Sequence, residues 1–82
     1  MKNEWEVRLP DLDLVGMPCR ATVWHARLGD WVNQGDRLLE IVADGILVDI
    51  PAPTSGFLRR RLVVEEDPVM NGQLVAVIEE ER

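Results

Sequence analysis

The chain has 82 residues, a formal net charge of −6, 46% hydrophobic residues and 29% charged residues. This length fits one domain, and the composition is that of a globular rather than a disordered protein. Because phosphate backbones and anionic lipids repel an acidic surface, we expect no nucleic-acid and no membrane partner. The single cysteine excludes an internal disulfide, and no apolar run reaches the ~20 residues of a membrane span, so we expect a cytoplasmic protein.

Six short segments are rich in strand-forming residues or alternate between apolar and polar positions. In the first, "WEVRLP", the residues Trp5, Val7 and Leu9 share one face. The others, in chain order, are "RATVWHARL" (20–28), "DRLLEIVAD" (36–44), "GILVDIPAP" (45–53), "GFLRRRLVV" (56–64) and "GQLVAVIEE" (72–80). Turn-forming residues separate the segments, and no long helix is indicated. Many short strands at regular spacing predict an all-β sandwich or barrel.

The chain also contains an internal repeat. The segment "GDWVNQGDRLLEI" (29–41) aligns with "EDPVMNGQLVAVI" (66–78), and Gly35 is matched by Gly72 at a spacing of 37 residues (72 − 35). Extended backwards, the alignment pairs Cys19 with Gly56, where each half should enter its first long strand. Two similar halves predict pseudo-two-fold symmetry, with Asp44-Gly45 as a protruding hairpin tip between them.

This repeat, together with "IPAPTSG" (50–56), resembles a lipoyl domain of the lipoyl/biotinyl carrier family. The resemblance covers roughly residues 7–80, so we interpret residues 1–82 as a single lipoyl-like domain. It implies an all-β flattened barrel-sandwich hybrid of two four-stranded sheets. Asp44 and Ile46 flank the tip where biotinyl domains carry methionines, so the resemblance is nearest to lipoyl domains of 2-oxo acid dehydrogenase acyltransferases.

The hairpin tip departs from that family. In lipoyl domains it reads Asp-Lys-Ala, and the lysine carries lipoate in an amide bond. The matching residues here are Asp44, Gly45 and Ile46, and the only lysine is Lys2. We therefore expect no covalent lipoate or biotin and no attachment site. Asp-Gly strongly favours a type I′ turn, which needs positive φ at both central residues, so turn geometry alone accounts for Gly45. The alternative is a tip that is itself a recognition surface.

Three further features distinguish the chain. In lipoyl domains the loop beside the lysine hairpin helps partner enzymes choose their carrier. Here that loop is apolar and is a candidate partner surface, unless it packs on the barrel, through Leu12, Leu14, Val15 and Met17. Cys19 and Glu66 stand where the family or the repeat has glycine, so we expect reshaped turns. For the three arginines 59–61 we expect pairing with Asp49 or with the acidic cluster 65–67, and a bulge or a snorkelling Arg61.

No catalytic residue is indicated, and one histidine with one cysteine cannot supply a closed zinc site, so we predict neither an enzyme nor a metal site. We interpret the chain as a protein-interaction or accessory module for a 2-oxo acid dehydrogenase or acyltransferase-type complex. Two alternatives stay open. One is a carrier or transfer protein with another attachment site, such as Cys19 or Lys2. The other is a structural subunit of a carboxylase- or acyltransferase-type assembly.

Overall fold

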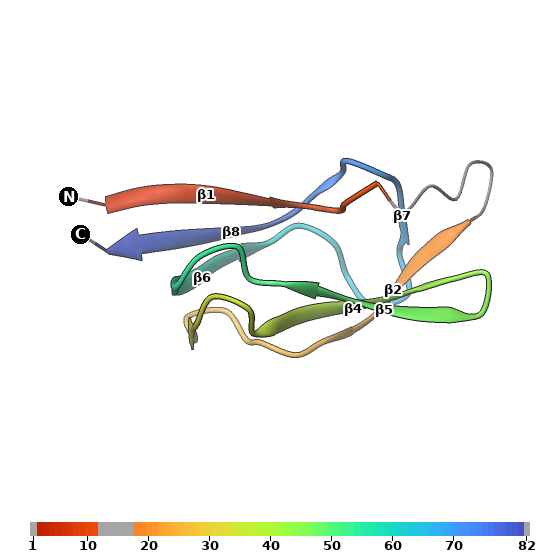
Figure 1. Ribbon diagram of the computed structural model, residues 1–82, viewed down its shortest axis with the longest axis horizontal. Helices are drawn as coiled ribbons and strands as arrows, with labels where there is room; N and C mark the ends of the chain where they lie inside the picture. Colours follow the sequence, from red (N-terminus) through yellow and green to blue (C-terminus); the bar gives the residue numbers. More distant parts are fainter. Residues whose placement is uncertain (1, 12–17, 82) are drawn as a thin grey trace.

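The computed structural model describes residues 2–11 and 18–81, which form two four-stranded antiparallel sheets and no helix. The strand orders are β1-β8-β6-β3 and β5-β4-β2-β7. The strands β1, β4, β5 and β8 run along the long axis of a body measuring 41 × 19 × 19 Å (Figure 1). The strands are β1 (Lys2–Arg8), β2 (Cys19–Trp24), β3 (Trp31–Val32), β4 (Arg37–Ala43), β5 (Ile46–Pro51), β6 (Gly56–Arg61), β7 (Pro68–Val69) and β8 (Leu74–Glu81). The all-β architecture predicted from the sequence is confirmed.

The backbone has the internal symmetry that the repeat predicts. Strands β6 and β7 begin 37 residues after β2 and β3 (56 − 19 and 68 − 31). In one sheet Cys19 pairs with Val69, and in the other Gly56 pairs with Val32, which is the equivalent contact. Hydrogen bonds of the connecting turns recur at the same spacing. Each half therefore contributes strands to both sheets in the same way.

The core fills the space between the two sheets. The strands β4 and β8 contribute consecutive as well as alternate side chains to the buried interior, residues 38 and 39 in β4 and residues 75–78 in β8. The largest fully buried side chains come from both halves of the chain and are Leu9, Leu38, Leu39, Ile41, Ile50, Leu58, Ile78 and Val75. Burial of such a side chain contributes ~1.5–3 kcal/mol, so this apolar layer stabilises the small domain.

The two ends of the body differ. The β4–β5 hairpin protrudes at one end, and β1 begins and β8 ends at the other (Figure 1). Lys2, the first residue of β1, therefore starts its strand at the end opposite the hairpin tip. Residues 2–11 and 18–81 contain no helix long and apolar enough to cross a membrane.

The expectation of reshaped turns at Cys19 and Glu66 is wrong. Glu66 has a φ of 79°, close to the 89° of its counterpart Gly29, so the turn keeps its left-handed conformation without a glycine. Cys19 is the first residue of β2 and pairs in register within the sheet. The second turn therefore keeps its shape at the cost of backbone strain on a residue with a side chain.

The arginine run 59–61 only partly follows expectation. The register of β6 against β8 shifts between Leu58 and Arg60, so a bulge is present, but it lies beside Arg59 and not at Arg61, where the sequence predicts it. The sequence predicts that the run pairs with Asp49 or with the acidic cluster 65–67. This prediction is wrong for Arg59, which forms an ion pair with Glu79 at 3.1 Å. This pair is formed across neighbouring strands of one sheet, so Arg59 is a surface-pairing residue and not part of an anion site.

Candidate functional site

The β4–β5 hairpin ends in a two-residue turn. Ala43 pairs with Ile46, and the residues between them, Asp44 and Gly45, have φ values of 49° and 77°. Positive φ at both central residues is what a type I′ turn requires, and it matches the right-handed twist of the two strands. Glycine adopts this conformation freely, and aspartate is one of the few other residues that visit it routinely. The turn predicted from Asp-Gly is confirmed.

Packing does not require a glycine at the tip. A Cβ atom added to Gly45 would meet no heavy atom within 4 Å. Its φ of 77° strains any side chain there, but no neighbour blocks one. A longer side chain at this position would therefore project into solvent, as an attachment residue must.

Two large apolar side chains follow the tip on the edge strand β5. Ile46 is 59% exposed and Leu47 is 63% exposed. We call Gly45, Ile46 and Leu47 the tip patch. Because successive side chains of a strand point to opposite faces, Ile46 and Leu47 expose apolar surface on both sides of the hairpin end. Ile46 and Leu47 lie on an edge strand, whose outward backbone groups have no neighbouring strand among the described residues.

A pocket of about 500 Å³ opens beside the tip, between the ends of β2 and β4 and the start of β7. We call it the tip pocket, and its lining consists of Pro18, Cys19, Arg20, Val42, Asp44, Gly45, Glu66 and Pro68. Arg20 and Glu66 form an ion pair across it at 3.1 Å. Glu66 is the residue with the strained backbone, so the tip pocket combines apolar walls, both signs of charge and a strained turn.

The other residues singled out from the sequence are dispersed. The candidate partner surface formed by Leu12, Leu14, Val15 and Met17 lies outside the described residues. Cys19 is a reduced thiol, only 8% exposed. It lines the tip pocket, whereas Lys2 starts a strand at the opposite end of the body. The structure therefore brings one of the two alternative attachment residues near the tip, and that residue is buried.

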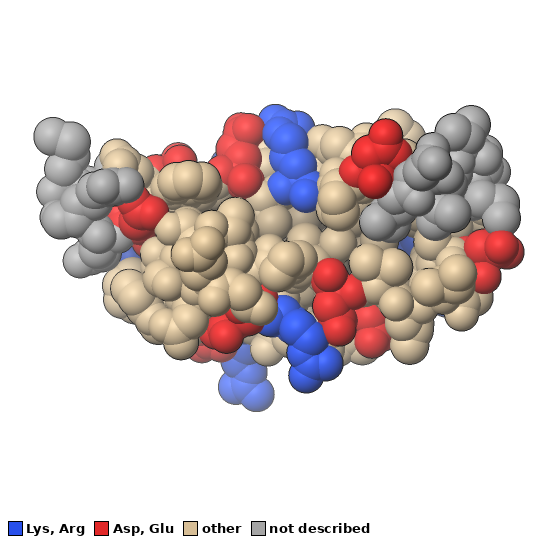
Figure 2. All heavy atoms as spheres, in the orientation of Figure 1, with Lys and Arg blue, Asp and Glu red and all other residues tan. Residues whose placement is uncertain are grey.

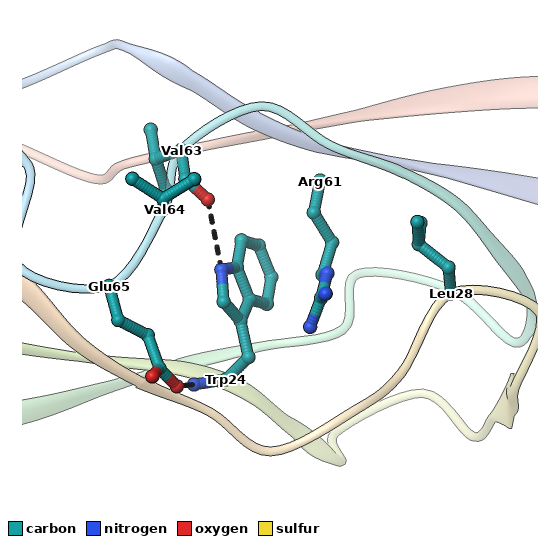
Figure 3. A pocket seen from close by; sticks show the side chains of 6 residues that line it. All are labelled: Trp24, Leu28, Arg61, Val63, Val64 and Glu65. Atoms are coloured by element: carbon teal, nitrogen blue, oxygen red, sulfur yellow. Dashed lines mark hydrogen bonds between the residues drawn. The ribbon is translucent and has the colours of Figure 1, made fainter.

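A second pocket, of about 340 Å³, lies beside Trp24 and was not foreseen from the sequence (Figure 3). The Trp24 Nε1–H donates to the Val63 carbonyl at 3.0 Å, and its backbone N–H donates to Glu65 Oε2 at 3.0 Å. Arg61 lies over the indole ring. Trp24 is partly buried and packs against the core cluster. Most of the polar groups that line this pocket already have partners within the domain. The pocket therefore has the character of a structural contact rather than of a binding site.

The electrostatic surface is mixed. On the face shown in Figure 2, acidic and basic side chains are interspersed. Among the described residues, Arg8 and Glu6 form an exposed ion pair, with 2.9 Å between Nη2 and Oε1. Binding to a nucleic-acid backbone uses clustered positive charge, so this face suits a partner of mixed charge better than a phosphate backbone.

Two pseudo-symmetric four-stranded sheets, with a protruding hairpin whose turn has two residues, define a β-sandwich of the carrier-domain type. The sequence profile of the family Biotin_lipoyl, described as "Biotin-requiring enzyme", matches residues 5–78, and the chain belongs to this family.

Curated relatives are acyltransferase components. The chain is 36% identical over 61 residues to the dihydrolipoyllysine-residue acetyltransferase component of the acetoin cleaving system of Pseudomonas putida, a match that covers 74% of this chain and 16% of that protein. It is 30% identical over 73 residues to the dihydrolipoyllysine-residue succinyltransferase component of the 2-oxoglutarate dehydrogenase complex of Haemophilus influenzae, with 89% of this chain and 18% of that protein covered. The chain thus spans less than a fifth of either relative.

Solved structures agree on the fold. The urea carboxylase of Kluyveromyces lactis superimposes with a TM-score of 0.80 at 28% identity, covering 93% of this chain and 6% of that one. The lipoyl domain of the 2-oxoglutarate dehydrogenase complex from Azotobacter vinelandii superimposes with a TM-score of 0.73 at 20% identity, covering 93% of this chain and 95% of that one. At that identity the second match shows the fold alone.

Proposed function

We propose that this chain is a lipoyl-like domain without an attached cofactor, and that it acts as a non-catalytic interaction or accessory module for a 2-oxo acid dehydrogenase or acyltransferase-type complex. The observation that carries the proposal is Gly45 at the hairpin tip, in the position where the family resemblance calls for the acceptor lysine. The curated relatives, which are components of such complexes, supply the class of partner.

The surroundings of the tip support a contact role. The tip patch exposes Ile46 and Leu47 at the end of the body, where a partner can reach them without displacing the core. The adjacent tip pocket offers the Arg20–Glu66 pair beside apolar walls. A partner that docks on carrier domains would therefore meet a shaped, partly apolar surface even though no swinging arm is attached.

Attachment elsewhere is the less favoured alternative. Acylation of a thiol needs an accessible sulfur, and Cys19 is 8% exposed within β2. Lys2 begins its strand far from the tip, so a group carried there would not reach the face that carrier domains present. We accordingly propose no covalent lipoate or biotin and no catalytic activity of its own. A cytoplasmic location belongs to the same proposal, because a chain with a single cysteine forms no internal disulfide and so suits a reducing compartment.

A second candidate function is a structural subunit of a carboxylase-type assembly. The observation that favours it is the superposition on urea carboxylase, which has a TM-score of 0.80 at 28% identity. In that role the domain would act through permanent association rather than through reversible docking.

Affinity capture with matched variants tests the leading proposal. The 82-residue chain, Leu47→Asp and Val64→Asp would be used to capture proteins from extract of the native host. Leu47 and Val64 are 63% and 65% exposed, so the two substitutions add the same charge at equally open sites. We expect dehydrogenase or acyltransferase components with the wild type and with Val64→Asp, and their loss with Leu47→Asp.

Two results would contradict the proposal. Capture of such components by Leu47→Asp at wild-type levels would show that the tip patch does not contribute to the contact with them. An increase in the intact mass of the chain from native cells, matching a lipoyl or biotinyl group, would overturn the absence of a cofactor. Stable copurification with a carboxylase that survives both substitutions would favour the second candidate function instead.

A further inference from the structure

Against the expectation from the sequence that there is no metal site, we propose that His25, Glu40 and Asp49 form a binding site for a divalent metal ion, and that Zn²⁺ is the ion they suit best. Each residue offers one ligand atom, and the three atoms all lie within 4.8 Å of one another. The inference is independent of the proposed function, since it concerns neither the tip patch nor the tip pocket.

Three neighbouring segments of one sheet bring the ligands together. Glu40 on β4 and Asp49 on β5 are direct cross-strand partners. His25 directly follows β2, the neighbour of β4 on its other side, and its backbone N–H donates to the Leu38 carbonyl at 2.8 Å. All three side chains are therefore held by a hydrogen-bonded sheet, and a site on strands is more rigid than one on loops.

The spacing is close to that of a coordination sphere. Zn²⁺ binds nitrogen and carboxylate oxygen at ~2.0–2.2 Å with tetrahedral angles, which separates neighbouring ligand atoms by about 3.4 Å. His25 Nε2 and Asp49 Oδ1 lie 3.3 Å apart in a hydrogen-bonded contact, which a bound ion would replace. Since the third ligand atom is within 4.8 Å of both, a modest rotation of the Glu40 side chain completes the set. The fourth position of the tetrahedron is left for water or for a ligand from a partner.

Outer contacts orient both carboxylates. The Thr22 hydroxyl lies within hydrogen-bond distance of Glu40 Oε2, at 2.7 Å, and of the Glu40 carbonyl, at 3.1 Å, so it restrains the Glu40 side chain. Arg37 Nη1 lies 3.6 Å from Asp49 Oδ2, which leaves Oδ1 facing His25. Partners of this kind fix the orientation of metal ligands and raise affinity. Thr22 also sits where the β2–β4 register shifts, and bulges commonly redirect side chains near sites.

The ligand set selects the ion. One imidazole nitrogen with two carboxylates suits Zn²⁺, whereas Ca²⁺ and Mg²⁺ prefer sites made of oxygen alone. The two carboxylates supply the negative charge that attracts a divalent cation, and Arg37 beside Asp49 Oδ2 offsets part of it. The side chains of His25 and Asp49 are 26% and 37% exposed, so an ion can enter from solvent.

Calorimetric titration of the 82-residue chain with zinc chloride tests the site. We expect saturable binding of one Zn²⁺ per chain, and no comparable binding of Mg²⁺. His25→Ala should weaken the Zn²⁺ affinity by about tenfold or more, as should Glu40→Gln and Asp49→Asn. The matched controls Glu65→Gln and Asp44→Asn remove carboxylate charge elsewhere and should leave the affinity unchanged.

Two checks keep the result specific. Cys19→Ser should bind Zn²⁺ as the wild type does, because the thiol is not a ligand in this proposal. Zinc-free thermal unfolding of His25→Ala should follow the wild type, which shows that lost binding is not lost folding. The proposal is overturned by an absence of saturable Zn²⁺ binding to the wild type, or by binding that persists in all three ligand variants.

Discussion

Arg61 lies over the indole ring of Trp24, with its guanidinium carbon 5.4 Å from the ring centroid. The two residues occupy equivalent positions in the two halves, 37 residues apart (61 − 24), yet they end strands of different sheets. Trp24 Nε1 donates to the Val63 carbonyl at 3.0 Å, and Arg61 Nη1 donates to the Ala26 carbonyl at 3.4 Å. These carbonyls are also 37 residues apart (63 − 26). The pair thus meets at the pseudo-two-fold axis and joins the two sheets there.

The contact between Arg61 and Trp24 predicts that removal of the arginine side chain lowers the stability of the domain. Arg61→Ala should lower the free energy of unfolding by about 1 kcal/mol, through loss of the cation–π contact and of the arginine stem on the ring. Urea unfolding followed by tryptophan fluorescence measures this cost. Arg60→Ala is the matched control, because it removes a neighbouring exposed arginine and should change stability by no more than ~0.5 kcal/mol. Equal effects of the two substitutions would show that the contact with Trp24 contributes nothing.

Strain at Glu66 predicts a stabilising substitution. Glu66 has a φ of 79°, a region that costs a residue with a side chain ~1–2 kcal/mol, whereas glycine adopts it freely. Glu66→Gly should be more stable than Glu66→Ala by about 0.5–1 kcal/mol, after allowance for the greater unfolded-state entropy of glycine. Both variants lose the ion pair with Arg20, so the comparison isolates the backbone. Chemical denaturation that ranked Glu66→Ala above Glu66→Gly would contradict a strained turn.

Close packing around Gly56 predicts that Gly56 and its equivalent in the first half, Cys19, differ in how much stability they lose on substitution by alanine. A Cβ atom on Gly56 would lie 2.8 Å from Ile78 Cγ2 and 2.9 Å from the Glu79 carbonyl carbon. Gly56→Ala should therefore destabilise the domain by about 2–3 kcal/mol, because the backbone of β8 must move. Cys19→Ala, at the equivalent position of the first half, only shortens a buried side chain and should cost about 1 kcal/mol. Thermal unfolding compares the two, and similar midpoints for both variants would argue against the close approach of β6 and β8.

The internal repeat explains why so much of the fold was predictable. The alignment of Cys19 with Gly56 placed the start of a long strand in each half, and β2 and β6 begin at those residues. The Asp-Gly pair specified the turn at the tip, since two positive φ values leave few residue choices. Features of this kind can be predicted from the sequence because they depend mainly on residues that are adjacent in the chain.

Contacts between strands were less predictable, because bulges break the alternation on which sequence reasoning depends. The register shifts near Thr22 in β2 and within the arginine run of β6. Beyond such a shift, the face of the sheet on which a side chain lies can no longer be predicted from its position in the sequence. The stacking of Arg61 on Trp24 and the grouping of His25 with two carboxylates both lie beside these shifts. Only the pairing of the strands in space brings these side chains together.

Substitution at the tip tests whether the carrier surface survives. Gly45→Lys should fold, because an added Cβ meets nothing within 4 Å, and should cost about 1 kcal/mol for placing a side chain at a φ of 77°. If the domain still presents the surface that partners of lipoyl domains recognise, a lipoyl ligase should modify the introduced lysine efficiently, and intact mass spectrometry will show it. Gly29→Lys provides the control, since it adds a lysine to an equally open turn of positive φ and should stay unmodified. A folded Gly45→Lys variant that the ligase leaves unmodified would count against a domain that mimics a carrier, because the lysine would then be present without the surface that makes it a substrate.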